Sequence, residues 1–336
     1  MPTTPVLRPS SGPAYARIAG VGGYRPSRVV PNEEIAPRID SSDTWIRERS
    51  GIVERRWAGP EESVAVMGAA AAGKALAHAG VTPDQIGCVL VATSTHFRQL
   101  PALAADIAHR TGVTDAAAFD LSAACAGFTH ALAVAHDLVR GGSAGHVLVV
   151  GTERMSDLID HDDRSTAFLF GDGAGAVVVG PSDLPAMGPV VWGADGSQGH
   201  AIDQSASWLE LRHERPERFP ALTMQGQTVF RWAVYEMARA ARRALEAAGV
   251  DAADLDAFVP HQANLRIVDA LANTLRLPAG VAVSHDIVHT GNTSAASIPL
   301  AMEQLLASGA VRSGGLALTI GFGAGLSYAG QVVTLP

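Results

Sequence analysis

Hydrophobic and polar residues follow two spacings along the chain, and each spacing predicts a different element. Short continuous apolar runs predict buried strands, and apolar residues at every third or fourth position predict helices. Glycine ends several of these helices. The predicted strands are 17–22, 87–93, 146–150, 175–179, 257–260, 281–284, 316–320 and 327–334, with one more ending just before Cys125. The predicted helices are 42–51, 62–79, 102–110, 126–140, 228–248, 265–275 and 295–306, and residues 181–222 have no clear period.

The order of these elements repeats once. Residues 74–81 match residues 243–250, and residues 146–151 match residues 316–321, at offsets of 169 and 170. Self-similarity at about half the chain length indicates a duplicated unit. Alternating strands and helices favour open sheets with helices on both faces. We therefore predict an α/β fold with a disordered tail at 1–14, a first half at 15–180 and a second half at 181–336.

Cys125 lies where a predicted strand turns into a predicted helix. Free N–H groups and the positive end of the helix dipole favour a thiolate at such a position, which would make Cys125 a nucleophile. A small buried thiol is the other interpretation. The repeat aligns Cys125 with about Ala295, and the strand end near Ala92 with His261. Because ligands bind beyond the carboxyl ends of strands in such sheets, we expect Cys125, His261 and Asn292 to face one crevice.

His261 and Asn292 each have a structural and a chemical interpretation. A histidine on a turn after a strand can be a base or a hydrogen-bond donor, but more often it caps a helix or is satisfied in the core. An asparagine before a helix is usually its N-cap. Cysteine with histidine and asparagine is a known nucleophilic arrangement.

Composition narrows the function. The 336 residues carry 25 Lys and Arg against 33 Asp and Glu, a formal charge of −8, which disfavours a nucleic-acid role. Two cysteines cannot build a disulfide framework or a metal cluster. The N-terminus lacks the apolar region of a signal peptide, and no apolar run reaches the roughly 18 residues of a membrane helix. We therefore expect a cytoplasmic protein that binds neither nucleic acid nor membrane.

Three motifs together resemble the active-site motifs of β-ketoacyl-acyl-carrier-protein synthase III, the initiating condensing enzyme of bacterial type II fatty-acid synthesis. They are residues 120–128 (DLSAACAGF), 260–264 (PHQAN) and 291–294 (GNTS). The likeness extends from about residue 15 to 335. It implies the thiolase fold, a five-layered αβαβα sandwich, and a homodimer. It also implies an acyltransferase that condenses a short acyl-CoA with malonyl-acyl-carrier protein, giving 3-oxoacyl-carrier protein, CoA and CO2.

The resemblance also implies roles for the three residues. Cys125 would carry the acyl group, and the backbone N–H groups of Cys125 and Ala324 would stabilise the oxyanion. His261 and Asn292 would donate hydrogen bonds to the malonyl thioester oxygen during decarboxylation. Two uncharged donors suit this step, because a charged partner would bind malonate itself and hinder loss of CO2. No cofactor is implied, since the CoA thioester is a substrate.

Further residues resemble the family's substrate contacts. Trp45 would stack on the adenine of CoA, Arg49 and Arg164 would meet its nucleotide end, and Asn264 would lie near the pantetheine arm. Without the resemblance, a core tryptophan, surface arginines and an N-cap are the default interpretations. Phe322 would pack near Cys125.

Two further predictions concern partners. Leu100, in residues 95–101, would line the pocket of the partner subunit and so influence the choice of acyl starter. Carrier proteins are acidic, so an acidic enzyme needs a local basic patch to dock one. Arg231 and Arg266 are the candidates. The family carries further basic residues where this chain has Asn273 and Thr274.

Other enzyme classes fit less well. Thiolases use a second cysteine near the C-terminal glycine-rich loop, but residues 321–325 have none. Elongating ketosynthases have two histidines where this chain has His261 and Asn292. Plant-type polyketide synthases share the three residues but are longer, and an inactive scaffold would be expected to lose one of them. A priming enzyme of a type II polyketide pathway stays open, because its motifs would be the same.

Overall fold

The computed structural model describes residues 7–214 and 219–336 and has two five-stranded mixed sheets at its centre. The first sheet has the order β1-β7-β6-β4-β5. Its strands are β1 (Tyr15–Tyr24), β4 (Ile86–Ala92), β5 (Ala117–Leu121), β6 (His146–Arg154) and β7 (Asp172–Ser182). The second sheet repeats this order as β8-β14-β13-β11-β12. Its strands are β8 (Val191–Ala194), β11 (Ala257–Pro260), β12 (Ala282–Val283), β13 (Leu316–Gly323) and β14 (Ser327–Thr334).

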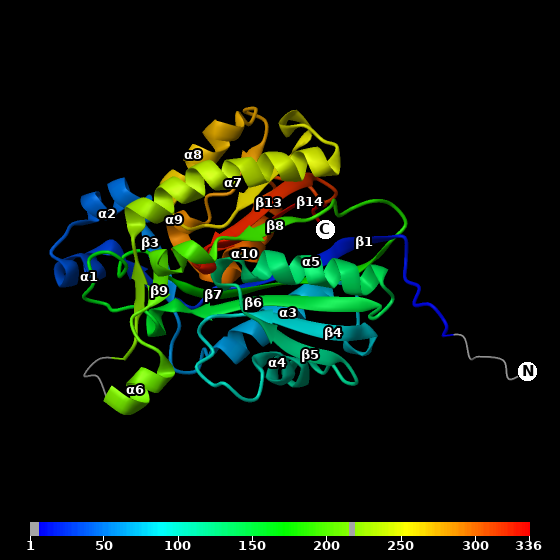
Figure 1. Cartoon of the computed structure of the whole chain (residues 1–336), viewed down its shortest axis with the longest axis horizontal. Coiled ribbons are helices and arrows are strands. Elements are labelled where there is room, and N and C mark those ends of the chain that lie inside the picture. The colour runs from blue at the N-terminus through cyan, green and yellow to red at the C-terminus, as the bar shows by residue number, and fades with distance from the viewer. Residues whose placement is uncertain (1–6, 215–218) are drawn as a thin grey trace, which may run out of the picture.

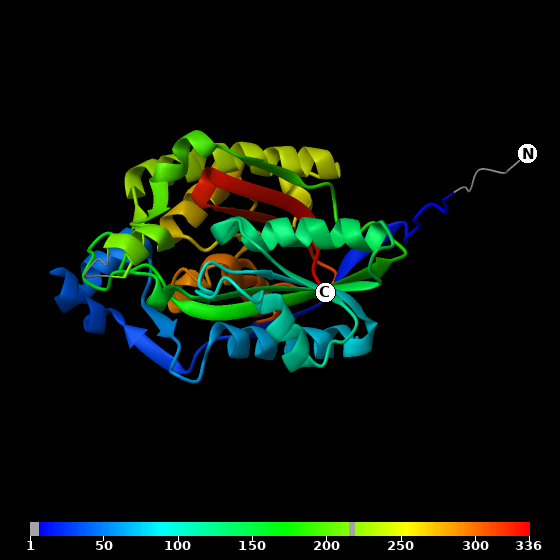
Figure 2. The ribbon, with the colours of Figure 1, turned by 60° about the horizontal axis from the view of Figure 1, so that its bottom comes forward.

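Six helices complete five layers, which Figure 2 shows edge-on. The outer layers are α3 (Val64–Ala79) with α4 (Leu103–Thr111) on the first sheet, and α7 (Gly226–Ala248) with α8 (Leu265–Leu275) on the second (Figure 1). The middle layer is α5 (Gly127–Arg140) with α10 (Ser297–Ala307). Buried residues of both sheets pack onto this middle layer in one core. The predicted duplicated αβαβα sandwich is confirmed.

The smaller elements lie at the end of the sandwich near the carboxyl ends of the parallel strands. They are β2 (Arg28–Pro31), α1 (Asn32–Ile35), α2 (Asp43–Ser50), β3 (Glu54–Trp57), β9 (Ile202–Gln204), α6 (Trp208–Glu214), β10 (Leu222–Met224) and α9 (Ile287–Thr290). The irregular interpretation of residues 181–222 is wrong in part. It misses β8, an edge strand of the second sheet, and β9, which pairs with β10. These strands are three or four residues long and half exposed, so their burial leaves no periodic pattern in the sequence.

Local signals set most helix ends as predicted. The Ser42 side chain accepts from the N–H of Trp45 and begins α2, and Gly51, at φ +76°, ends it. Ser63 caps α3 in the same way. Of the predicted N-terminal tail, residues 1–6 lie outside the described residues. Nearer the fold, Arg140 donates from Nε to the carbonyl of Ala14 at 3.0 Å.

Two glycines let the halves of the chain approach each other closely. A Cβ on Gly151 in β6 would lie 2.3 Å from the carbonyl oxygen of Ala295 in the second half. A Cβ on Gly321 in β13 would lie 2.4 Å from Oγ1 of Thr129 in the first half. The two glycines occupy matching positions of the repeat. Each half therefore holds, against its own central strand, the turn that carries the other half's chemistry.

We expect Gly151→Ala to push β6 away from the turn that contains Ala295. The new Cβ would meet the backbone carbonyl of Ala295, which cannot move aside as a flexible side chain can. The free energy of unfolding should fall by roughly 1–3 kcal/mol, the usual cost of overpacking, and activity should fall with it. Denaturant unfolding and steady-state kinetics measure both. The control is Gly73→Ala in α3, where a Cβ meets nothing within 4 Å. It should keep activity and gain up to about 1 kcal/mol of helix propensity. Equal effects of the two substitutions would contradict this account.

Candidate active site

Cys125 lies in a tight 3₁₀ turn, Ala124–Ala126, between β5 and α5. The preceding residue, Ala124, has φ +47°, a left-handed backbone conformation that residues other than glycine rarely adopt. The second half repeats this turn at Ser294–Ala296, where Ser294 has φ +49°. Cys125 and Ala295 therefore occupy equivalent positions, as the repeat predicts.

The Cys125 thiol is neutral in this site. Its pKa is raised to about 11, mainly because of burial; an interaction with the Ser294 hydroxyl lowers the pKa, and the charge of the nearby Glu153 carboxylate adds to the rise. The expectation that the helix N-terminus would favour a thiolate is therefore wrong for the free protein. The physical reason is that desolvation of a buried charge outweighs the partial charges of the turn. Any reaction in which this sulfur acts as a nucleophile would need an acceptor for the thiol proton.

A pocket of about 800 Å³ connects Cys125 to the surface, and its wall is mostly apolar. That size and character suit a thioester with a long arm. Eleven of the twelve residues singled out from the sequence line it: Trp45, Arg49, Cys125, Arg164, Arg231, His261, Asn264, Arg266, Asn292, Phe322 and Ala324. The structure thus brings together residues from both halves of the chain.

His261 follows β11 and is 2% exposed. Its Nδ1 lies 2.7 Å from Oγ of Ser297 at the start of α10. That hydroxyl also accepts a long bond, 3.4 Å, from the N–H of Gln262, so its own hydrogen is available to Nδ1. With the Ser297 hydrogen on Nδ1, the imidazole proton is on Nε2, and we assign His261 this tautomer, in which it is a donor to the pocket. Burial lowers the pKa of His261 to about 3, so the ring is uncharged at neutral pH.

Asn292 follows α9 and is 5% exposed. Its Oδ1 accepts from the N–H of Ser294 at 2.9 Å, which orients the amide. Its Nδ2 makes only a long contact, 3.5 Å, to the carbonyl of Ala263, and so can donate into the pocket. The backbone N–H of Asn292 donates to the carbonyl of Leu169 in the first half. The amide thus has a fixed oxygen and a nitrogen that faces the pocket. The N-cap interpretation of Asn292 is wrong, because the N-cap position of the following 3₁₀ turn is Thr293.

The end of β13 lies directly against Cys125. A Cβ on Gly323 would be 2.9 Å from both N and Cβ of Cys125, so only glycine allows this approach. Ala324 follows immediately and lines the same pocket as Cys125. Phe322, which is 2% exposed, packs edge-to-face on the His261 ring at 5.2 Å between centroids. Its ring therefore restrains His261.

The outer part of the pocket is aromatic and basic. The guanidinium of Arg164 lies 4.9 Å from the Trp45 ring centroid, and that of Arg49 lies 5.6 Å from it. Asn264 caps α8 by accepting from the N–H of Arg266, and its Nδ2 donates to the carbonyl of Arg49 at 3.0 Å. The N-cap interpretation of Asn264 is thus confirmed, and the cap also ties α8 to α2.

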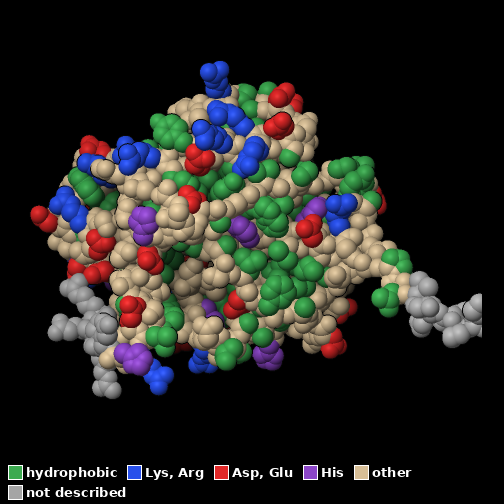
Figure 3. All heavy atoms as spheres, viewed as in Figure 1, with side chains coloured by type: hydrophobic (Ala, Val, Ile, Leu, Met, Phe, Trp, Pro, Cys, Tyr) green, Lys and Arg blue, Asp and Glu red, His purple; other side chains and the backbone are tan. Residues whose placement is uncertain are grey.

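Basic side chains gather outside the pocket on α7 and α8 (Figure 3). The arginines of these two helices are Arg231, Arg239, Arg242, Arg243 and Arg266. Arg231 and Arg266 reach the pocket wall, and Arg266 lies over the Phe230 ring at 5.5 Å. Arg242 and Arg243 bond the Thr274 carbonyl and the Tyr328 hydroxyl.

Leu100 is the exception among the predicted residues. It is 79% exposed and lies outside this chain's own pocket lining. Sequence reasoning, in turn, missed Ser294 and Ser297, which contact Cys125 and His261, and the buried Glu153. For Glu153, the sequence offered one signal: a glutamate at the end of an apolar strand, where a charged residue is unusual. Ser294 belongs to the 291–294 motif and Ser297 follows it, but nothing in the sequence distinguishes either serine from an ordinary helix-start residue.

Residues 7–214 and 219–336 contain neither a metal-ligand cluster nor a membrane-spanning helix. No cluster of three His, Cys, Asp or Glu side chains there could bind a metal ion. No described helix combines the length and the apolar character needed to cross a membrane.

Known proteins resemble the chain along its whole length. Two family descriptions match: "3-Oxoacyl-[acyl-carrier-protein (ACP)] synthase III" at residues 119–196 and its "C terminal" region at residues 245–335. A β-ketoacyl-[acyl-carrier-protein] synthase III of Streptomyces glaucescens is 61% identical over 98% of this chain and 99% of its own length. The structure of the priming β-ketosynthase from the R1128 polyketide biosynthetic pathway is 55% identical, with a TM-score of 0.97 and 99% of each chain covered. The synthase III structure of Pseudomonas aeruginosa PAO1 is 40% identical, with a TM-score of 0.88, over 96% of this chain and 98% of that one.

The fold and the site define an acyltransferase of the condensing type, built on the thiolase fold. The chain belongs to the β-ketoacyl-acyl-carrier-protein synthase III family. The predicted fold, family and enzyme class are confirmed. Its reaction is the condensation that initiates fatty-acid synthesis.

We expect Ser297→Ala to slow condensation by about tenfold or more, because the His261 proton is then no longer held on Nε2. Acylation of Cys125 should change little, since His261 is not needed there as a base. Separate assays of acyl loading and of malonyl-thioester decarboxylation measure the two steps. Ser308→Ala, at the other end of α10, removes a hydroxyl bonded only locally, to the Leu305 carbonyl, and is the control. Equal losses in both steps would contradict a role for Ser297 in orienting His261.

Proposed function

We propose that Cys125 is the nucleophile that accepts the acyl group of a short acyl-CoA. The adenine end would bind at Trp45, Arg49 and Arg164, and the pantetheine arm would extend down the pocket past Asn264. Cys125 Sγ attacks the thioester carbonyl, and the N–H groups of Cys125 and Ala324 stabilise the resulting oxyanion. Its collapse expels CoA and leaves an acyl-Cys125 thioester. Phe322 restrains His261 beside this thioester.

Condensation would follow at the same place with malonyl-carrier protein. His261 Nε2–H and Asn292 Nδ2–H donate to the malonyl thioester oxygen, so that loss of CO2 leaves a stabilised enolate. Its carbon attacks the acyl-Cys125 carbonyl, the 3-oxoacyl-carrier protein forms, and the Cys125 sulfur is released. Electrostatic stabilisation by fixed donors is usually the largest catalytic contribution to such a step.

One observation carries this proposal: a half-buried thiol and two buried, uncharged donors from the other half of the chain line one pocket. Since burial holds the pKa of His261 at about 3, neither donor bears a charge that would bind the malonyl carboxylate. The site thus favours departure of CO2 over tight binding of the carboxylate.

A second candidate is a priming role in a type II polyketide pathway. It is favoured by the likeness to the R1128 priming β-ketosynthase at 55% identity over 99% of both chains. The chemistry would be the same, with a different starter or a different carrier protein. The starter that loads fastest distinguishes the two.

The partners would be an acidic acyl carrier protein and a second copy of this chain. Arg231 and Arg266, at the pocket on a protein of formal charge −8, offer a local basic surface for the carrier protein. For the homodimer, the support is β5, the edge strand of the first sheet, with Phe119 42% exposed. A CoA substrate and two free cysteines fit a cytoplasmic location.

Intact mass after incubation with short acyl-CoAs tests the nucleophile. We expect one acyl adduct on the wild-type protein and on Cys88→Ala, and none on Cys125→Ala. Cys88 is the matched control, because burial raises the pKa of its thiol to about 11 as well. The adduct should disappear when malonyl-carrier protein is added, as ketoacyl-carrier protein appears. An adduct that persists in Cys125→Ala would overturn the assignment.

We expect Leu100→Trp to shift the starter preference towards acetyl-CoA, because the larger ring would shorten the pocket of the partner subunit in the proposed dimer. Relative loading rates of acetyl-, isobutyryl- and longer acyl-CoAs measure the shift. Leu184→Trp places the same ring at another exposed leucine, 73% exposed, on the loop after β7, and should leave the ratios unchanged. Unchanged ratios in Leu100→Trp would count against this role.

A further inference from the structure

Glu153 is a buried carboxylate close to the nucleophile, and the steps proposed above do not use it. It lies in β6 with 0% exposure, and it acts electrostatically on the Cys125 thiol. Burial raises its pKa, because removal from water disfavours the charged carboxylate. Glutamate is rarely fully buried without a partner that explains it.

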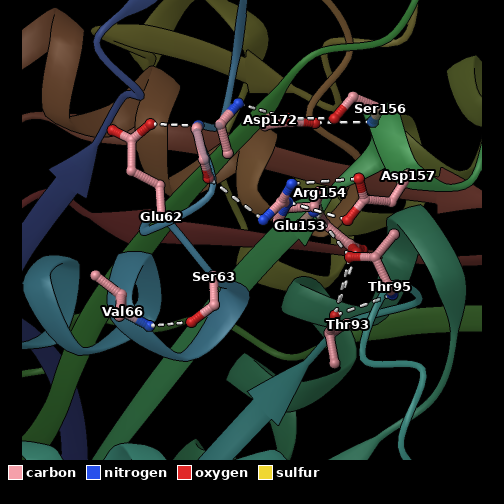
Figure 4. A network of polar contacts seen from close by, with 12 residues as sticks. Glu62, Ser63, Val66, Thr93, Thr95, Glu153, Arg154, Ser156, Asp157 and Asp172 are labelled. Carbon is pink, nitrogen blue, oxygen red and sulfur yellow. Dashed lines mark hydrogen bonds and ion pairs between the residues drawn. The ribbon is translucent and has the colours of Figure 1, made fainter.

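Hydrogen-bond donors surround Glu153 at the end of β4 (Figure 4). The N–H of Ser94 lies 3.0 Å from Oε2 and 3.1 Å from Oε1. The hydroxyl of Thr95 lies 2.6 Å from Oε2, and that of Thr93 lies 3.2 Å from it.

The two threonine hydroxyls are oriented as donors. Oγ1 of Thr95 accepts from the N–H of Arg154 at 2.8 Å, and Oγ1 of Thr93 accepts from the N–H of Thr95 at 3.2 Å. Each hydroxyl hydrogen is therefore available to Glu153. Such a set of donors supports the ionised carboxylate, which is also the form able to take a proton.

Ser294 connects this carboxylate to the thiol. Its hydroxyl interacts both with Cys125 and with Glu153. Ser294 is 1% exposed and has φ +49°, although the equivalent residue in the first half is the alanine Ala124. Because Ala124 has nearly the same backbone conformation, φ +47°, the turn itself does not require a hydroxyl at this position.

Ionisable groups on the neighbouring elements are engaged elsewhere. Arg154 pairs with Asp157. The carboxylate of Asp120 in β5 accepts from the N–H groups of Leu103 and Ala104. His261, in the assigned tautomer, carries its proton on Nε2 and accepts from Ser297 at Nδ1, so neither ring nitrogen is free to take the thiol proton.

We propose that Ser294 and Glu153 form a proton path that takes the Cys125 proton during acylation and returns it when the sulfur is released. The proposal rests on the acylation step argued above. Ser294 is the catalytic residue of the pair, because it touches the reacting thiol. Glu153 acts through it as a positioning residue and proton acceptor.

The proton that leaves Cys125 during acylation is the one that returns to it during condensation. As Sγ forms its bond to the acyl carbon, the thiol proton passes to Oγ of Ser294, and the Ser294 hydroxyl proton passes to Glu153. CoA leaves as a thiolate with the electron pair of its C–S bond and takes a proton from solvent. In condensation, the acyl carbon leaves Cys125 Sγ with its electron pair on sulfur. The proton on Glu153 then returns through Ser294 and restores the thiol and the carboxylate.

The acyl-enzyme must therefore contain a protonated Glu153. An infrared difference spectrum of acetyl-enzyme minus free enzyme should show a new protonated-carboxyl C=O band that shifts in D2O. Glu153→Gln, acetylated to the same extent by intact mass, should lack the band. Asp172→Asn, which removes another buried carboxylate (bonded to Ser156 and Ala58), should keep it.

Kinetics provide an independent readout. Glu153→Gln and Ser294→Ala should each acylate about 100-fold more slowly, the usual scale for a lost acid–base group. Their acylation rates should rise about tenfold per pH unit below the thiol pKa, a dependence that simple loosening of the fold would not produce. Malonyl-thioester decarboxylation by Glu153→Gln should stay within about twofold of the wild type, because no thiol proton moves in that step.

The outcomes separate this proposal from the function on which it rests. A wild-type adduct without the carboxyl band, or with a band that persists in Glu153→Gln, would overturn the proton path and leave the acyltransferase intact. Acylation of both variants at the wild-type rate would do the same. Absence of any wild-type adduct would overturn the acylation step itself. Should Glu153→Gln fail to fold, Ser294→Ala carries the kinetic test.

Discussion

The close approach of Gly151 and Gly321 to the opposite half of the chain is the constraint on which the rest of the site depends. Because each glycine has hydrogen in place of a side chain, each central strand lies directly against the other half of the chain. A Cβ on Gly151 would lie 2.3 Å from Ala295 in the Ser294–Ala296 turn, and a Cβ on Gly321 would lie 2.4 Å from Thr129 in α5 and 3.3 Å from Ala126 in the Ala124–Ala126 turn. Cys125 lies in one of these turns, and Asn292 precedes the other. A duplicated fold thus becomes a single active site at the contact between its copies.

Burial at that contact also sets the charges of the site. The same desolvation that raises the pKa of Cys125 to about 11 lowers that of His261 to about 3. The consequence is a site with a neutral thiol and neutral donors, and with an ionisable carboxylate one hydroxyl away. Condensation needs the neutral donors, and acylation needs the carboxylate, so one environment suits two successive steps.

Most of the fold and the location of the site could be predicted from the sequence, because the repeat shows which residues of the two halves lie at corresponding places in the fold. Alignment of the halves placed Cys125, His261 and Asn292 beside one crevice, although more than 130 residues separate Cys125 from His261. Strong periodicity and capping signals gave the 265–275 helix at its observed ends, Leu265–Leu275. The edge strand β8 was not predicted, because four half-exposed residues are too few to show a hydrophobic period.

The sequence could not predict the charge states. A helix N-terminus suggested a thiolate at Cys125, but the pKa depends on how much protein covers the thiol, which is a tertiary property. The bond from Ser297 to His261 has the same origin, since α10 and β11 meet only in the folded chain. Leu100, exposed on this chain, depends on a second copy for any contact with a pocket.

The most direct test of the account is to assay both half-reactions in Cys125→Ala and in Asn292→Ala. The account predicts that Cys125→Ala still decarboxylates malonyl-carrier protein but forms no acyl adduct. It predicts that Asn292→Ala still forms the adduct but loses decarboxylation by about 100-fold. Loss of both half-reactions in both variants would contradict the claim that the two halves of the chain bring separate chemistry to one pocket.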